Sequence, residues 1–269
     1  MKSLNGAELA SYIKSRQARQ VRALRQAWSI FPKLAIVQTT DDPVINTYVR
    51  LEKRYGEDIL IEVESFTLSE DQALAQIERL NSDSKVHGII VQLPLSDPSR
   101  TDQLVNAVDP AKDVDALGAG ATLDPATPMA INLLLAGYNI DLANKKIAIV
   151  GQGRLVGAPV TRMWRDSGYS VTTLDKSSEN LEETLKSSEV IVSAAGQPGL
   201  ITSDLVASGA VIVDAATASE NGEIVGDVAP SVRERSDVTI TPVRGGVGPL
   251  TVAALFDNVI RAASATKSD

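Results

Sequence analysis

Residues 241–251, TPVRGGVGPLT, form the segment of this chain whose composition is best suited to hold a ligand. Its three glycines allow main-chain N–H groups to approach a flat or charged molecule closely, and its two prolines stiffen the backbone around them. We expect no core packing to require such a backbone, although a turn that only connects two elements is the alternative. The apolar periodicity of TVAALFDNVIRAA predicts a helix that begins at Thr251.

A second glycine-rich turn joins a predicted buried strand, KIAIV, to a helical pattern. Its glycines are spaced G-x-G-x-x-x-G, one residue longer than the usual dinucleotide fingerprint, in the order of strand, turn and helix that the fingerprint requires. Helix N-termini present unpaired N–H groups that bind phosphate. We therefore predict a dinucleotide site at Gly151, Gly153, Arg154 and Gly157, with glycines that serve only packing as the alternative.

An acid stands at the end of the next predicted strand. Asp175 lies 24 positions after Gly151, where a dinucleotide-binding domain places the carboxylate that binds the ribose hydroxyls. A carboxylate there repels a 2′-phosphate, so Asp175 favours NAD over NADP. Lys176 follows directly and opposes this preference. An exposed loop acid or a helix cap is the alternative for Asp175.

The first half of the chain carries a different set of polar residues. In GIIVQLPL, a buried strand delivers Gln92 to its carboxyl end, where ligands bind in open α/β sheets. In KDVDAL, we expect Asp113 to be structural and Asp115 to bind the N–H groups of a heterocycle. A predicted helix places Tyr48 and Glu52 four residues apart on one face. Tyr48 offers a stacking ring, or is a core or rim residue.

Runs of Val, Ile and Leu alternate with helical patterns, which predicts an α/β fold with mostly parallel sheets buried on both faces. Residues 109–139 separate two such series and form the expected crossover between domains. The final helix is expected to return to the first domain. The first series has predicted strands at 33–38, 59–66 and 88–92 with helices at 44–55 and 69–81; the second has strands at 146–150, 170–174, 189–193, 210–214 and 238–241.

Composition excludes several classes of function. The formal net charge of −8 argues against a nucleic-acid or anionic-membrane partner, since both need clustered basic residues. The absence of cysteine excludes thiol chemistry, and a single histidine argues against a histidine metal centre, so we expect no metal. No apolar signal segment or membrane-length run is visible, and we expect a cytoplasmic protein.

The order of these motifs resembles that of the bifunctional methylenetetrahydrofolate dehydrogenase/cyclohydrolase family over nearly the whole chain. The resemblance implies a folate-binding domain at 1–126 and 247–269, a Rossmann-like NAD(P)-binding domain at 127–246, and a homodimer. It implies substrate-binding or catalytic roles for Tyr48, Gln92, Asp115, Gly246 and Pro249, and adds Gly196, Gly245 and Thr251 to the cofactor site. The segments that carry it are DPVINTYV, GIIVQLPL, KDVDAL, PATP, VGQGRLVGAP, AAGQPGLI, GEIVGDV and TPVRGGVGPLT.

Departures from the family pattern fall within the expected site. The family has a lysine four residues after the tyrosine, whereas this chain has Glu52, and Lys53 is rotated by about 100° around the helix. Glu52 is expected to be an ionised carboxylate at neutral pH, or a solvated residue with its charge turned away. The remaining departures are Ile45 for serine, Gln152 for arginine, Gly153 for serine, Arg244 for proline, Ala116 for glycine and Ala126 for cysteine.

These residues are compatible with three alternative functions. The first is a dehydrogenase that oxidises methylenetetrahydrofolate and has weak or no cyclohydrolase activity. The second is a catalytically silent relative that binds cofactor or folate. The third is a dehydrogenase of the same architecture that acts on another small molecule, as shikimate dehydrogenases do.

Overall fold

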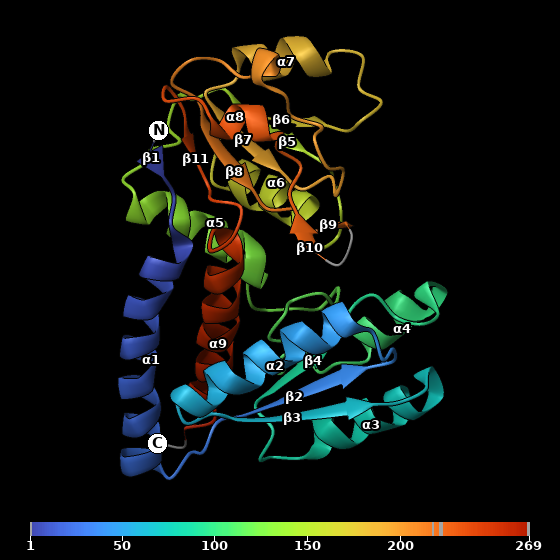
Figure 1. The fold of residues 1–269 in the computed structure, drawn as a ribbon. Helices are drawn as coiled ribbons and strands as arrows, with labels where there is room; N and C mark the ends of the chain where they lie inside the picture. The colour runs from blue at the N-terminus through green and yellow to red at the C-terminus, as the bar shows by residue number, and fades with distance from the viewer. Residues whose placement is uncertain (1, 217, 221–222, 268–269) are drawn as a thin grey trace. The chain divides into compact units, whose positions relative to one another are not determined.

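The computed structural model describes residues 2–216, 218–220 and 223–267. The chain divides into two compact units (Figure 1). Unit 1 contains residues 1–10 and 127–251, and unit 2 contains residues 11–126 and 252–269. Helices α1 (Gly6–Trp28) and α9 (Val247–Ala265) begin in unit 1 and continue in unit 2.

These bounds differ from the expected ones, because residues 1–10 and 247–251 belong to unit 1. The sequence gives no strand signal at its first residues, yet β1 (Lys2–Ser3) pairs in parallel with β11 (Thr239–Ile240). The start of α1 is also fixed there, since the Ala7 N–H donates to Gly245 O at 3.0 Å. Tertiary pairing therefore decides where the N-terminus belongs.

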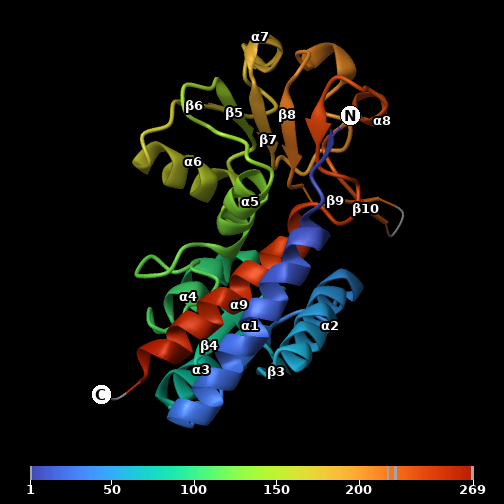
Figure 2. The ribbon, with the colours of Figure 1, turned by 90° about the vertical axis from the view of Figure 1, so that its left-hand side faces the viewer.

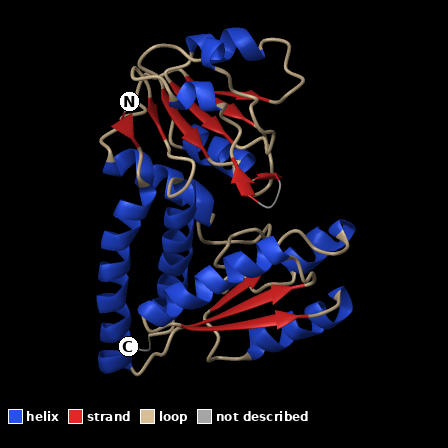
Figure 3. Ribbon diagram, in the orientation of Figure 1, coloured by secondary structure: helices blue, strands red, loops and turns tan. Residues whose placement is uncertain are grey.

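Unit 2 is built on a three-stranded parallel sheet in the order β3-β2-β4 (Figure 3). The apolar runs of β2 and β4 are buried, as strands covered on both faces must be. One face packs on α3 and α4, whose apolar side chains share a core cluster with the strands. The bounds are β2 (Lys33–Gln38), α2 (Pro43–Asp58), β3 (Glu62–Thr67), α3 (Glu70–Ser82), β4 (Gly88–Val91), η1 (Pro98–Arg100) and α4 (Thr101–Asn106).

Helices α1, α2 and α9 pack together on unit 2. Helices α1 and α9 run side by side (Figure 2), joined by bonds from Gln17 Nε2 to Ala253 O (2.7 Å) and from Arg16 Nη2 to Asp257 Oδ1 (2.7 Å). The Tyr55 hydroxyl of α2 donates to Gln17 Oε1 at 2.7 Å. These bonds fix α2, which carries the expected folate-side residues.

Unit 1 has a six-stranded parallel sheet in the order β1-β11-β8-β7-β5-β6. Strand order reverses at β5, the first strand of the second series, and ligands bind at such a point at the carboxyl ends of the strands. One face packs on α7, η2 and α8. The bounds are α5 (Ala126–Gly137), β5 (Ile147–Val150), α6 (Gly157–Asp166), β6 (Val171–Leu174), α7 (Leu181–Ser187), β7 (Val190–Ser193), η2 (Ser203–Leu205), β8 (Val211–Asp214), β9 (Ala218–Glu220), β10 (Glu223–Val225) and α8 (Pro230–Arg233).

The predicted fold class is confirmed: both units are α/β with parallel sheets. The largest shift in a strand end is at β3, expected from residue 59 and found from Glu62. Leu60 has a φ of +67° and the Ile61 N–H donates to Gly56 O at 2.8 Å, so the chain turns before the strand begins. Among the described residues, no helix is long and apolar enough to cross a membrane.

Candidate functional site

The carboxyl edge of the unit 2 sheet presents polar side chains from neighbouring strands. Gln92 comes directly after β4, and its N–H donates to Val37 O at 2.8 Å. The backbone at Gln92 is therefore still paired with β2. Gln38 ends β2 and is buried, with its Nε2 donating to Thr67 Oγ1 (2.9 Å) and Asn46 Oδ1 (3.1 Å). Sequence reasoning missed Gln38, although KLAIVQ ends in glutamine as GIIVQ does.

The loop after α4 carries two acids with different roles. Asp113 is buried and accepts the N–H of Gly118 at 2.8 Å, so it shapes the loop, as expected. Asp115 is partly buried; burial, and then the charge of Asp113, raise its pKa to about 7. Ala116 has a φ of +56°, a conformation that favours glycine, which accounts for the glycine of the family pattern here.

Glu52 lies in the buried stripe of α2, with Val49 one turn and Ile45 two turns before it. Its side chain is 8% exposed, and its Oε2 has no hydrogen-bond partner among the residues that the structure describes. Burial, and then the charge of Asp115, raise its pKa to about 8. The reading of Glu52 as a solvated residue is therefore wrong. The raised pKa also opposes the expected ionisation of Glu52 at neutral pH.

Tyr48 and Lys53 lie on either side of this position along α2. Tyr48 is partly buried one turn before Glu52, on the same side of the helix. Lys53 is also partly exposed, but it is rotated by about 100° from Glu52. The structure therefore brings Tyr48, Glu52 and Asp115 together within unit 2. Lys53 projects from a different side of α2 than Glu52.

The three glycines of the turn after β5 have different reasons to be glycine. Gly151 has a φ of +88°, and an added Cβ would lie 2.5 Å from Ala194 O. A Cβ on Gly157 would lie 1.8 Å from Gly151 O. By contrast, a Cβ on Gly153 would meet nothing within 4 Å. Packing thus requires Gly151 and Gly157, while Gly153 leaves open space where the chain enters α6.

Other residues of the expected cofactor site are exposed near the carboxyl ends of β5, β6 and β7. Arg154 and Lys176 are exposed, and Gly196 has a φ of +66° with nothing within 4 Å of an added Cβ. Asp175 Oδ1 accepts from Ser177 Oγ (2.6 Å) and from the Ser177 N–H (2.8 Å), and these bonds lower its pKa. Asp175 is therefore an ionised, exposed acid that also closes a turn.

The helix after the glycine-rich segment begins earlier than expected. Helix α9 starts at Val247, not at Thr251, so Gly248 and Pro249 lie in its first turn. Proline is tolerated there because its missing N–H has no partner within the helix. Thr251 Oγ1 donates to Val247 O at 3.3 Å.

The expectation that no packing requires this segment is also wrong. Gly245 has a φ of +84°, and its carbonyl accepts the Ala7 N–H. A Cβ on Gly6 would lie 1.9 Å from Gly246 O, so α1 begins in direct contact with this backbone. The segment is a junction within unit 1, whether or not it also borders a ligand.

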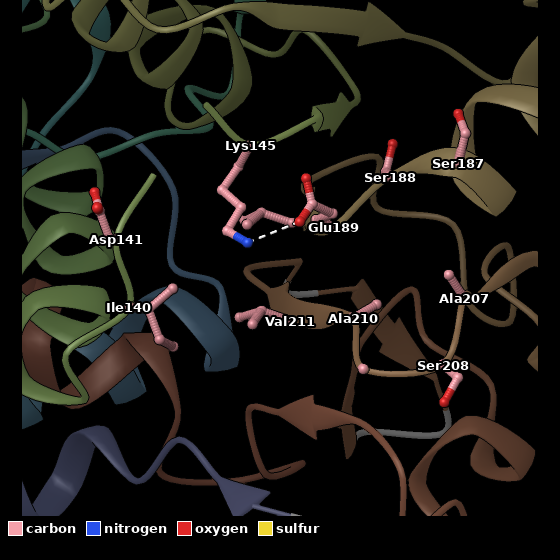
Figure 4. Close-up of a pocket in the computed structure, with 12 residues that line it drawn as sticks. Ile140, Asp141, Lys145, Ser187, Ser188, Glu189, Ala207, Ser208, Ala210 and Val211 are labelled. Carbon is pink, nitrogen blue, oxygen red and sulfur yellow. Dashed lines mark hydrogen bonds and ion pairs between the residues drawn. The ribbon is translucent and has the colours of Figure 1, made fainter. Parts of the chain in front are cut away.

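A separate hollow lies at the opposite edge of the unit 1 sheet (Figure 4). Lys145, Glu189 and Ala210 line it, and they lie one or two residues before the first residues of β5, β7 and β8. Lys145 Nζ donates to Glu189 Oε1 at 2.7 Å. Because dinucleotides bind at the carboxyl ends of parallel strands, this hollow is not the expected cofactor site. The described residues contain no cluster of three or more acidic or histidine side chains able to hold a metal.

Two family models cover most of the chain. Residues 4–115 match the catalytic domain of tetrahydrofolate dehydrogenase/cyclohydrolase, and residues 125–267 match its NAD(P)-binding domain. This chain belongs to the tetrahydrofolate dehydrogenase/cyclohydrolase family. The predicted family is thus confirmed.

Individual members of the family are similar over their full length. The bifunctional protein FolD of Macrococcus caseolyticus is 36% identical, with 97% of each chain covered. The solved structure of the bifunctional FolD enzyme of Campylobacter jejuni has a TM-score of 0.92 at 33% identity, covering 98% of this chain and 99% of the other. The FolD structure of Trypanosoma brucei, complexed with NADP cofactor and an inhibitor, has a TM-score of 0.92 at 26% identity, covering 98% and 97%.

Proposed function

We propose that this protein oxidises 5,10-methylenetetrahydrofolate to 5,10-methenyltetrahydrofolate with a nicotinamide dinucleotide, and that it hydrolyses the methenyl product slowly or not at all. Membership of the family over both domains supports the dehydrogenase activity. The proposed loss of hydrolysis is supported by Glu52, a buried acid at the position where the family pattern has a lysine.

We assign the folate to Tyr48, Gln92 and Asp115 in unit 2. Asp115 accepts hydrogen bonds from the pterin N–H groups, Tyr48 packs beside the ring, and Gln92 lies near the one-carbon unit. The dinucleotide, when bound, supplies the hydride acceptor. Hydride transfer depends mainly on the alignment of two carbons, so these side chains act by orienting the folate.

Hydrolysis of the methenyl compound needs more than alignment, because water must attack the cation and protons must move as the ring opens. A lysine ammonium can assist these transfers at neutral pH. The Glu52 carboxyl, with a pKa of about 8, carries no positive charge in either protonation state. Lys53 is placed on another side of α2 and does not substitute for the missing lysine.

For the cofactor we propose NAD in preference to NADP. The ionised Asp175 follows β6, where a carboxylate accepts ribose hydroxyls and repels a 2′-phosphate. Arg154 and Lys176 are the cations near enough in sequence to oppose this preference. Calorimetric titration with each dinucleotide tests it: tighter binding of NADP than of NAD contradicts the assignment of Asp175.

Two assays on the purified protein test the proposed activity. Reduction of NAD measures hydride transfer, and the spectroscopic decay of methenyltetrahydrofolate, after subtraction of buffer hydrolysis, measures the cyclohydrolase activity. We expect the wild type to transfer hydride and to hydrolyse at the buffer rate. Glu52→Lys should gain hydrolysis, because the new ammonium would be held beside Asp115.

Lys53→Ala is the matched control, one residue along the same helix. It should leave both activities of the wild type unchanged. Strong hydrolysis by the wild type that disappears in Lys53→Ala would make Lys53 the working lysine and overturn the proposal. If no variant transfers hydride or hydrolyses, the protein is a catalytically silent relative.

We also propose a homodimer that works in the cytoplasm. The resemblance to the family supports the dimer, and a chain without cysteine suits a reducing compartment. Light scattering during gel filtration measures the mass of the assembly, and a monomer at micromolar concentration would contradict the dimer.

A further inference from the structure

A buried acid in unit 1 binds the backbone that follows β7. Asp227 is 0% exposed, and it accepts one hydrogen bond from the side chain of Ser193, the last residue of β7, and two from the backbone that follows. Its Oδ2 accepts from Ser193 Oγ (2.6 Å) and from the Ala195 N–H (2.7 Å), while its Oδ1 accepts from the Gln197 N–H (2.6 Å). Both carboxylate oxygens are therefore used, one on each side of Gly196.

The same acid is joined to a partly buried ion pair between Asp214 and Arg233. The Asp227 N–H donates to Asp214 Oδ1 at 3.1 Å, and Arg233 Nη2 donates to Asp214 Oδ2 at 2.7 Å. Arg233 Nη1 also donates to Thr241 O at 2.5 Å, and the Asp214 N–H donates to Thr241 Oγ1 at 3.0 Å. Thr241 opens the glycine-rich segment, so one network holds the backbone at the carboxyl ends of β7, β8 and β11.

The backbone that Asp227 holds is also the surface against which the dinucleotide turn packs. An added Cβ on Gly151 would lie 2.5 Å from Ala194 O and 2.7 Å from Ala195 Cα. A displacement of residues 194–197 therefore displaces the Gly151 turn, because no side chain separates the two segments. Asp227 is fully buried, and it acts on the turn through this backbone.

We propose that Asp227, held by Asp214 and Arg233, is a positioning residue that sets the geometry of the dinucleotide site. This inference rests on the proposed function, since it assigns the dinucleotide to the Gly151 turn. It goes beyond that function by naming a residue that determines cofactor affinity without touching the cofactor.

The substitution Asp227→Asn tests the role of the two oxygens. An amide offers one acceptor oxygen and one NH2 donor, so the NH2 would face either the Gln197 N–H or the Ala195 N–H. A donor facing a donor pushes that backbone away, at a cost similar to that of an unpaired buried group. Dinucleotide affinity should fall by about tenfold or more, since bonds to charged groups are worth enough for such a change.

The experiment measures NAD and NADP binding by calorimetry on the full chain, together with KM values for dinucleotide and folate. We expect Asp227→Asn to raise the dissociation constant and KM of the dinucleotide, with kcat at saturating dinucleotide and the folate KM within about twofold of wild type. Asp237→Asn is the matched control, because Asp237 is an exposed acid of unit 1 paired with Arg235. It should bind dinucleotide as the wild type does.

Arg233→Met is the second variant, in case Asp227→Asn does not fold. It leaves all three bonds to Asp227 in place but removes those from Arg233 to Asp214 and Thr241. It should raise the dinucleotide KM several-fold without changing the folate KM. A folded Asp227→Asn or Arg233→Met protein with wild-type dinucleotide affinity overturns the inference. A wild type that binds neither dinucleotide defeats the proposed function instead.

Discussion

The carboxyl group of Glu52 lies within electrostatic range of Asp115, and the negative charge of Asp115 raises the pKa of Glu52. Burial is the larger cause for both acids, which have pKa values of about 8 and about 7. The two acids therefore do not both ionise at neutral pH. At the position where the family pattern has a lysine, this chain therefore has a carboxyl group whose raised pKa favours retention of its proton.

This proton makes the stability of the protein depend on pH. Between the ordinary pKa of 4.5 and the raised value of about 8, the folded state keeps the Glu52 proton and the unfolded state loses it. Stability must then fall as the pH rises through this window. Glu52→Gln lacks the effect, so its midpoint of thermal unfolding should exceed that of the wild type by several degrees at pH 8.5, since each pKa unit is worth about 1.4 kcal/mol.

Thermal unfolding at pH 5 and pH 8.5 provides the measurement. At pH 5 the wild type and Glu52→Gln should unfold at nearly the same temperature. Glu57→Gln, an exposed acid on the same helix, should follow the wild type at both values. Equal midpoints for wild type and Glu52→Gln at pH 8.5 would show that Glu52 is not protonated in the folded state.

The rate of hydride transfer should also depend on this proton. Loss of hydride from the methylene group creates a cation, which an ionised Glu52 stabilises. We expect kcat/KM for the folate to rise several-fold from pH 6.5 to 8.5 and then to level off. In Glu52→Gln the part of the rise above pH 7.5 should disappear. Identical pH profiles for the two proteins would remove Glu52 from the reaction.

The parallel sheets could be predicted from sequence because burial on both faces imposes continuous apolar runs. KLAIVQ gave the bounds of β2, and the order of strand, glycine turn and helix at β5 lies within one short segment of the chain. The helical period also places Glu52 with Ile45 and Val49. These features depend on residues close together in the chain.

Contacts between distant residues could not be predicted. The pKa of Glu52 is raised first by burial and then by the charge of Asp115, which lies on the loop after α4. Strand β1 has two residues and exists only because β11 pairs with it. Asp227 carries no signal of its role, because its partners lie about 30 residues away at Ser193, Ala195 and Gln197. The local propensities of the residues give no information about such contacts.

Two glycines of the dinucleotide turn should respond differently to alanine. In Gly157→Ala the new methyl would collide with Gly151 O, so the turn must move and stability should fall by about 1–3 kcal/mol. In Gly153→Ala the methyl meets nothing, and the midpoint of unfolding should stay near that of the wild type. Dinucleotide binding should also stay near that of the wild type, because the family pattern has serine at this position and so already accommodates a Cβ there. Calorimetry on both variants checks this, and a loss of binding of about tenfold in Gly153→Ala would mean that this chain holds the cofactor closer to Gly153 than the family pattern implies.

The glycine-rich segment offers a last pair, Gly245 and Gly248. Gly245 has a φ of +84°, so Gly245→Ala should lose about 1 kcal/mol of stability whatever the segment binds. Gly248 lies in the first turn of α9 with nothing within 4 Å of an added Cβ, so Gly248→Ala should gain up to about 0.5 kcal/mol from helix propensity. Stability therefore cannot explain a loss of function in Gly248→Ala. If this variant unfolds at or above the wild-type temperature but binds folate or dinucleotide more weakly, Gly248 is glycine because a ligand needs the space. If it binds both normally, the segment serves only to join β11 to α9 and to support the start of α1.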